Sequence, residues 1–338
     1  MSVRLRHIAH FAVAAALYYS GALTLRRWLR HDVLRRRELT VIGLHRVLTV
    51  EERAASSSEE AMAVLLPTFI RMLELLKKSF DVVSFEEVWR GNFPLGKKPK
   101  CLLTFDDAWQ DIFANAIPAL RRSGLHAVVF VPTGLLDSRE PFWVERLTCV
   151  WKQGQTAQCA VRTAAGASCD KRIDTLADAI AVLKTLSANR RETIVRGLAR
   201  QFPAQQPAPL DRFMSWDELA ESAQLMHAES HTVHHVLLDV EDEATSRREL
   251  AESRQDLCRR TGREVRALAY PNGNHDERVR RWAKEAGYEW GFTVCRGIFG
   301  EDDDRMQVPR LLLQEGNLTN PWGAFSPAML HLRLTGWR

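Results

Sequence analysis

Short apolar runs alternate with helical stretches along most of this chain. The sequence predicts strands at residues 39–44, 101–105, 127–131, 265–270, 290–294 and 309–313. Helical patterns lie between them, at residues 67–78, up to Gly124, from Ser215, at 242–260 and at 276–286. Such alternation is typical of a parallel β-sheet covered by helices, either open or closed into a barrel. We therefore expect an α/β fold.

The alternation is interrupted between about residue 138 and residue 211. This stretch holds patches of Gly, Ala, Gln and Pro and one long helical pattern, residues 173–201. We interpret it as a helical insertion in a single domain that spans residues 38–338, a length that α/β barrels often reach as one unit.

The first 37 residues differ from the rest in charge and hydropathy. They contain one acid, Asp32, and eight arginines, at positions 4, 6, 26, 27, 30, 35, 36 and 37. The apolar stretch from Ile8 to Leu25 is at the lower limit for a bilayer span. A signal peptide, an interfacial or uncleaved anchor, and a helix packed on the domain are the alternatives. We expect a membrane-associating segment, at an inner membrane of the bacterial type, on a side that the sequence leaves open.

The net charge of +5 is concentrated in that segment, and the remaining chain is close to neutral. The basic composition therefore gives little support to a nucleic-acid-binding groove, and we expect no nucleic-acid partner.

Two adjacent carboxylates, Asp106 and Asp107, directly follow an apolar strand. Burying both charges is costly unless a cation or hydrogen-bond donors meet them. One could bind a metal while the other faces a substrate, since active sites of parallel α/β folds lie at the carboxyl ends of the strands. The alternative is a solvated turn or a helix N-cap.

Two histidines, His231 and His235, are four residues apart in the segment Ser230-His-Thr-Val-His-His235. This spacing places two imidazoles on one face of a helical turn, where they could share a metal ion. His234 is then a bystander. A cluster of surface histidines is the alternative.

Taken together and in order, these segments resemble the polysaccharide deacetylase family, the NodB-homology group or carbohydrate esterase family 4. Thr104-Phe-Asp-Asp107 and His231-Thr-Val-His-His235 resemble its first two motifs, and the resemblance extends over about residues 41–313. Its further segments are Leu44-His-Arg-Val47, Val129-Phe-Val-Pro-Thr-Gly134, Phe142-Trp143, Met214-Ser-Trp-Asp-Glu218, Leu268-Ala-Tyr-Pro-Asn-Gly273, Ala286-Gly-Tyr288, Phe292-Thr293 and Pro309-Arg310.

The resemblance implies a distorted (β/α)7 barrel and a metal-dependent hydrolase that removes N-acetyl groups from an amino-sugar polysaccharide or a lipid-linked glycan. It implies that Asp107, His231 and His235 hold one divalent metal ion, zinc by default. It implies that Asp106 is the base that deprotonates the attacking water.

Three positions depart from the family pattern. Ala108 stands where a glycine is usual. The arginine that usually holds the base is missing from its motif, and Arg310 is our candidate substitute. The usual C-terminal histidine acid is not evident, so His45 is the candidate acid, with a structural histidine as the alternative.

Four further side chains are candidates for lining the sugar or acetyl pocket, although core packing is the commoner fate of such residues. They are Trp109, Tyr270, Trp290 and Leu313. Two other functions are open. One is a catalytically inactive, membrane-tethered glycan-binding protein on the same fold. The other is a phosphoesterase or nuclease, disfavoured because no glycine-rich phosphate loop is evident.

Overall fold

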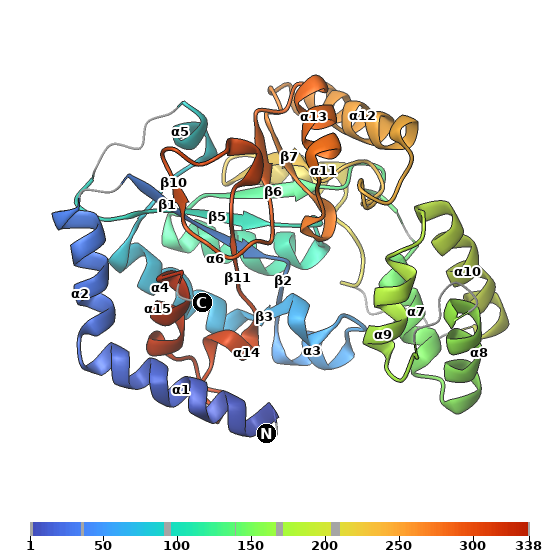
Figure 1. The fold of residues 1–338 in the computed structure, drawn as a ribbon, viewed down its shortest axis with the longest axis horizontal. Coiled ribbons are helices and arrows are strands. Elements are labelled where there is room, and N and C mark those ends of the chain that lie inside the picture. Colours follow the sequence, from blue (N-terminus) through green and yellow to red (C-terminus); the bar gives the residue numbers. More distant parts are fainter. Residues whose placement is uncertain are drawn as a thin grey trace.

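We analysed a computed structural model of the chain, which describes residues 3–34, 37–90, 96–138, 140–166, 172–203 and 210–336. Its centre is a nine-stranded sheet in the order β10-β1-β5-β6-β7-β8-β9, with β11 beside β1 and β4 beside β5 (Figure 1). The described pairings are parallel except that of β1 with β10. The strands are β1 (Glu38–Leu44), β4 (Asp81–Val82), β5 (Lys100–Phe105), β6 (Ala127–Val131), β7 (Met226–Ser230), β8 (Ala267–Ala269), β9 (Trp290–Phe292), β10 (Phe299–Gly300) and β11 (Leu311–Leu312).

The sheet curls back toward its first strand. A parallel bridge joins Phe292 of β9 to Val308, only three residues before β11, and β11 itself pairs with β1. A separate two-stranded sheet is formed by β2 (Arg46–Leu48) and β3 (Ala63–Leu65). The predicted α/β fold is therefore confirmed, with a curled, mainly parallel sheet, and the (β/α)7 barrel stays a prediction.

Both faces of the central strands are buried, which explains their continuous apolar sequences. Alternate residues point to opposite faces. Ile42, Leu103 and Val129 belong to the core beneath the helices, whereas Leu102 and Phe130 belong to a second core inside the curl, in which five of the fourteen buried residues are aromatic.

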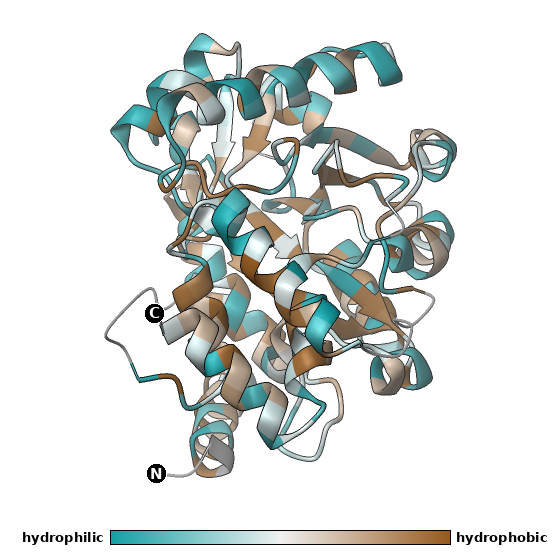
Figure 2. Ribbon diagram, turned by 90° about the vertical axis from the view of Figure 1, so that its right-hand side faces the viewer, coloured by the Kyte–Doolittle hydropathy of each residue, from teal (hydrophilic) through white to brown (hydrophobic). Residues whose placement is uncertain are grey.

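The outer helices begin and end where local sequence signals place them. Ser215 caps its helix in a capping box with Glu218, and Gly124 and Gly262 end theirs with φ values of 66° and 65°. Figure 2 shows α12 and α13 mainly in teal, as expected for helices with a solvated face. These and the smaller helices are α3 (Val50–Ala55), α4 (Leu66–Ser79), α5 (Phe85–Trp89), α6 (Ile117–Ser123), α11 (Trp216–Ser222), α12 (Glu243–Thr261), α13 (Glu277–Glu285), α14 (Glu315–Leu318) and α15 (Pro327–Leu334).

The stretch predicted as an insertion is helical and forms a group of its own beside the sheet (Figure 1). It contains α7 (Trp143–Trp151), α8 (Gln155–Gly166), α9 (Leu176–Leu183) and α10 (Ala188–Gln201). These helices share a separate core that includes Leu147, Val161 and Val195. The single helix expected at 173–201 is two helices, and the domain boundaries stay a prediction.

The N-terminal segment contains α1 (Val3–Tyr19), α2 (Ala22–Trp28) and the π-helical turn η1 (Leu29–Val33). Ala14 and Leu23 are buried against α15, and His7 donates to the carbonyl of Thr319 over 3.0 Å. Among the described helices, none is by itself long and apolar enough to span a bilayer. The runs Leu5–Tyr19 and Ala22–Val33 satisfy that test only as a pair, bent by 62°. One face thus packs on the domain, and membrane association stays a prediction.

Candidate active site

The chemically distinctive residues follow the carboxyl ends of neighbouring parallel strands. His45 follows β1, Asp106 and Asp107 follow β5, and His231 follows β7. Because parallel strands end at the same edge, these side chains come together although they are far apart in the sequence. The backbone is strained there, with positive φ at Asp107 (70°) and Ala108 (55°), a feature that is common at functional sites.

Asp107, His231 and His235 form a three-residue cluster. The Oδ1 atom of Asp107 lies 3.4 Å from Nε2 of His231 and 3.3 Å from Nε2 of His235. His231 donates from Nδ1 to the carbonyl of Ala269 over 2.7 Å, which leaves its Nε2 as the free ligand atom. Trp109 donates from Nε1 to the other Asp107 oxygen over 3.1 Å.

This donor set fits a divalent cation. One ligand atom from each residue lies within 4.8 Å of the other two. Two imidazole nitrogens and one carboxylate oxygen match a hydrolytic metal site with open positions, and the Ala269 carbonyl supplies the outer hydrogen bond that orients a ligating histidine.

The expectation that His231 and His235 share a helical turn is wrong. The segment is a tight turn after β7, with positive φ at Thr232 (65°) and His235 (54°). Glu249 of α12 holds the turn, because its carboxylate accepts from the backbone N–H groups of Val233 and His234, each over 2.8 Å. His234 also pairs with Glu249 through its ring, so it lies outside the three-residue cluster, as its spacing predicted.

Asp106 lies beside this cluster and pairs with Arg310. The guanidinium donates to both carboxylate oxygens, over 2.7 and 2.8 Å, and its Nε donates to the carbonyl of Thr293 over 2.8 Å. Burial raises the pKa of Asp106, but the charges of Arg310 and His231 and the hydrogen bonds from Arg310 together outweigh this effect and lower the pKa overall. His45 is near, with Nε2 3.7 Å from Asp106 Oδ2, beyond hydrogen-bonding distance.

These residues open into a cleft of about 810 Å³, part of which is open solvent. Of the four predicted lining residues, only Trp109 lines it. Tyr270 is buried and donates to the carbonyl of Met306, Trp290 belongs to the second core inside the curl, and Leu313 belongs to the core beneath the helices. These three side chains therefore lie in the core, not in the cleft.

The helical insertion supplies much of the opposite wall, which our sequence analysis did not identify. Phe142, Glu145, Lys184 and Arg191 all line the cleft. Phe142 contacts the ring of His235 edge-on, with centroids 5.2 Å apart. Phe142 belongs to the segment Phe142-Trp143 of the family resemblance, although no role was predicted for it. No motif marks Glu145, Lys184 or Arg191, and the only signal for them was the location of the insertion between two strands of the sheet.

A buried charge network beneath the cleft was also missed. Arg46 donates to Asp111 over 2.8 Å and to Asp211 over 2.5 Å, and its guanidinium lies 4.6 Å from the ring centroid of Trp109. Arg46 is fully buried. The available signal was an arginine inside the apolar run Leu44–Leu48, because a buried charge requires partners.

Comparison with known proteins identifies the family. A model of the family described as "Polysaccharide deacetylase" matches residues 95–291, more than half of the chain. The chain belongs to the polysaccharide deacetylase family. The matched range includes both aspartates and both cleft histidines. Arg310 and His45 lie outside it, so their assignment depends on the geometry described above.

The following relatives of the chain are distant in sequence. The Bacillus subtilis (strain 168) protein named "Putative polysaccharide deacetylase YxkH" is 25% identical over 114 residues, which cover 33% of this chain and 41% of that protein. A Streptococcus pyogenes deacetylase, PplD, solved with acetate, has a TM-score of 0.56 at 19% identity, over 85% of this chain and 96% of that one. A de-N-acetylase from Aggregatibacter actinomycetemcomitans has a TM-score of 0.52 at 16% identity, over 82% and 95%. At these identities the structural likeness shows a shared fold.

Proposed function

We propose that this chain is a metal-dependent hydrolase that removes N-acetyl groups from an amino-sugar polysaccharide or a lipid-linked glycan. One observation carries the proposal. A carboxylate held by a buried arginine, Asp106, lies beside a three-residue metal-ligand cluster at the floor of one cleft. Membership of the deacetylase family and a fold shared with a de-N-acetylase support this assignment.

Asp107, His231 and His235 would hold the metal ion, with zinc the first candidate for two imidazoles and one carboxylate. A divalent cation bound there supplies Lewis acidity, which polarises a carbonyl group and makes water a stronger acid.

The protein's own groups then move the protons. Asp106, kept ionised by Arg310, accepts a proton from the water that adds to the acetamide carbonyl carbon. The C–N bond breaks as the sugar nitrogen receives a proton, which gives acetate and a free amine. His45, beside Asp106, is the candidate donor of that proton. Arg310 acts through Asp106 and is a positioning residue.

Membrane attachment through the N-terminal segment is part of the proposal, at an inner membrane of the bacterial type. It is supported by side-chain exposure. Of the twelve large apolar side chains that are exposed in the described chain, nine lie between residues 5 and 34. Such a concentration is typical of a surface that contacts another apolar phase.

Acetate release from N-acetylglucosamine oligomers tests the activity. We expect Asp106→Asn to retain the metal ion but lose turnover, and His231→Ala to lose both. His234→Ala is the matched control, because this histidine pairs with Glu249 outside the cluster. Full activity in Asp106→Asn would contradict its role as base. A metal-loaded wild-type protein that releases no acetate from any acetylated glycan would favour a binding protein on this fold.

A further inference from the structure

A second pocket lies beneath α2, at the opposite ends of the strands from the candidate active site. It occupies about 580 Å³, part of it open to solvent. Glu38 and Thr40 at the start of β1 and Pro99 just before β5 form part of its wall. The candidate active site instead follows the other ends of β1 and β5, so the two pockets are separate.

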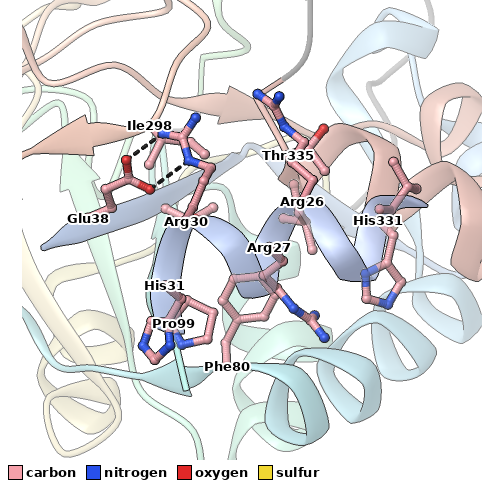
Figure 3. A pocket seen from close by; sticks show the side chains of 13 residues that line it. Arg26, Arg27, Arg30, His31, Glu38, Phe80, Pro99, Ile298, His331 and Thr335 are labelled. Atoms are coloured by element: carbon pink, nitrogen blue, oxygen red, sulfur yellow. Dashed lines mark hydrogen bonds and ion pairs between the residues drawn. The ribbon is translucent and has the colours of Figure 1, made fainter. Parts of the chain in front are cut away.

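The pocket is strongly basic. Three arginines of α2 and η1, Arg26, Arg27 and Arg30, line it together with a single acid, Glu38. Arg30 already pairs with Glu38, as Figure 3 shows, with one bond of 3.0 Å from Nε. Among the described residues, Arg27 forms no ion pair with an acid.

Arg27 is the most informative of these arginines. Its side chain lies over Phe80, with the guanidinium carbon 5.9 Å from the ring centroid (Figure 3). Its Nη1 atom is buried and has no hydrogen-bond partner among the described residues. A buried donor without a partner costs free energy, and an anionic oxygen in the pocket would remove that cost.

The remaining walls are apolar, and so is the outer surface of the covering helix. Leu23, Phe80, Ile298 and Leu334 line the pocket. On the same helical segment, Leu25, Trp28 and Leu29 do not line the pocket and are 54%, 50% and 41% exposed. A single helical segment thus presents basic groups inward and apolar groups outward.

We propose that this pocket binds one anionic phospholipid, with the phosphate at Arg27 and the start of an acyl chain along the apolar wall. This proposal rests on the membrane attachment proposed above, in which the exposed residues of α1 and α2 contact the bilayer that would supply the lipid. This combination distinguishes a lipid from a phosphate ester of a polar alcohol, which would gain little from the apolar wall and nothing from the exposed helix surface. The pocket fixes α2 against the domain through the bound molecule.

The test uses the full chain and dihexanoyl phosphatidate, a phospholipid soluble as a monomer, with binding followed by titration calorimetry. We expect saturable binding, weakened roughly tenfold to a hundredfold by Arg27→Gln, because a charge-assisted hydrogen bond is lost. Arg27→Lys keeps the charge and should retain most of the affinity. Arg6→Gln removes an exposed arginine of α1 that does not line the pocket, and it should bind like the wild type.

Two comparisons distinguish a phospholipid from free inorganic phosphate as the bound anion. Inorganic phosphate should bind at least about a hundredfold more weakly than the lipid, since it lacks the apolar part. Equal affinity for both ligands would overturn the lipid assignment, as would unchanged lipid binding in Arg27→Gln. Acetate release from a soluble oligomer should be the same in Arg27→Gln and wild type. Because lipid binding is measured without turnover, failure of the deacetylase proposal and failure of this one are distinguishable.

Discussion

Glu145 should make the protein less stable as the pH rises. It lies on α7 and is only 4% exposed, and its Oε2 atom has no hydrogen-bond partner among the described residues. The single charge of Arg46 is already shared by Asp111 and Asp211. Burial therefore raises the pKa of Glu145 from 4.5 to about 8, against a smaller opposing effect of Arg46.

The direction of the pH dependence follows from which protonation state of Glu145 the folded protein favours. The folded protein favours the neutral acid, so Glu145 reduces the free energy of unfolding least below pH 4.5. Its cost grows as the pH rises from there to about 8 and is constant above. A pKa raised by about 3.5 corresponds to roughly 5 kcal/mol at 1.36 kcal/mol for each pKa unit, of which about 4 kcal/mol appears between pH 5 and pH 9.

Glu145→Gln removes the titration and keeps the shape. Urea unfolding of both proteins, with the same metal content, should give similar free energies of unfolding at pH 5. At pH 9 the variant should be more stable than the wild type by up to about 4 kcal/mol. A constant difference between the two proteins across this pH range would refute the buried neutral acid.

Four further predictions concern the site and its supports. Arg310→Gln should remove most turnover and destabilise the fold by about 3–5 kcal/mol, since Asp106 is left buried and unpaired. The acidic limb of its pH–activity profile should move to higher pH, because the partner that lowers the pKa of Asp106 is gone. An acidic limb at the wild-type pH would contradict the pairing. Arg46→Met should destabilise the protein by about 3–5 kcal/mol in thermal or urea unfolding by stranding Asp111 and Asp211, whereas the exposed Arg122→Met should change stability by less than about 0.5 kcal/mol. Treatment with a chelator should abolish acetate release and lower the melting temperature of the wild type but leave the melting temperature of His231→Ala unchanged; equal responses would contradict the metal cluster. Gly43→Ala should destabilise the protein by about 1–3 kcal/mol in urea unfolding, since a Cβ there would lie 2.5 Å from Leu312 Cδ2. If this variant were as stable as the wild type, β11 would have to shift to make room for the added methyl group.

The periodicity of the sequence was sufficient for the central part of the fold. Strands β1, β5 and β6 are long, continuously apolar and bounded by turn residues, and their predicted positions agree with the structure to within one residue. The strand β7 was missed because it reads Met-His-Ala-Glu-Ser, and His227 and Glu229 hide an apolar pattern. These two side chains pair with each other over 2.9 Å, which a sequence cannot show.

Within the site, the sequence identified what a motif specifies and missed what tertiary packing specifies. Asp107, His231 and His235 were predicted as a group and lie together. Tyr270 and Trp290 were expected in the cleft because aromatic side chains often contact sugars. Which face of a short strand meets the cleft depends on the curl of the sheet, and periodicity carries no information about curl.

The position of Arg310 shows how one role can be filled from a different part of the chain. Asp106 follows β5, β5 pairs with β1, and β1 pairs on its other side with β11, directly after Arg310. An arginine just before β11 can therefore reach across the glycine of β1 to the end of β5, and Gly43 leaves it room, with Arg310 Nη1 3.7 Å from where a Cβ would lie. The pairing of β1 with both β5 and β11 is therefore what brings the base and its arginine together, although they are 204 residues apart in the sequence.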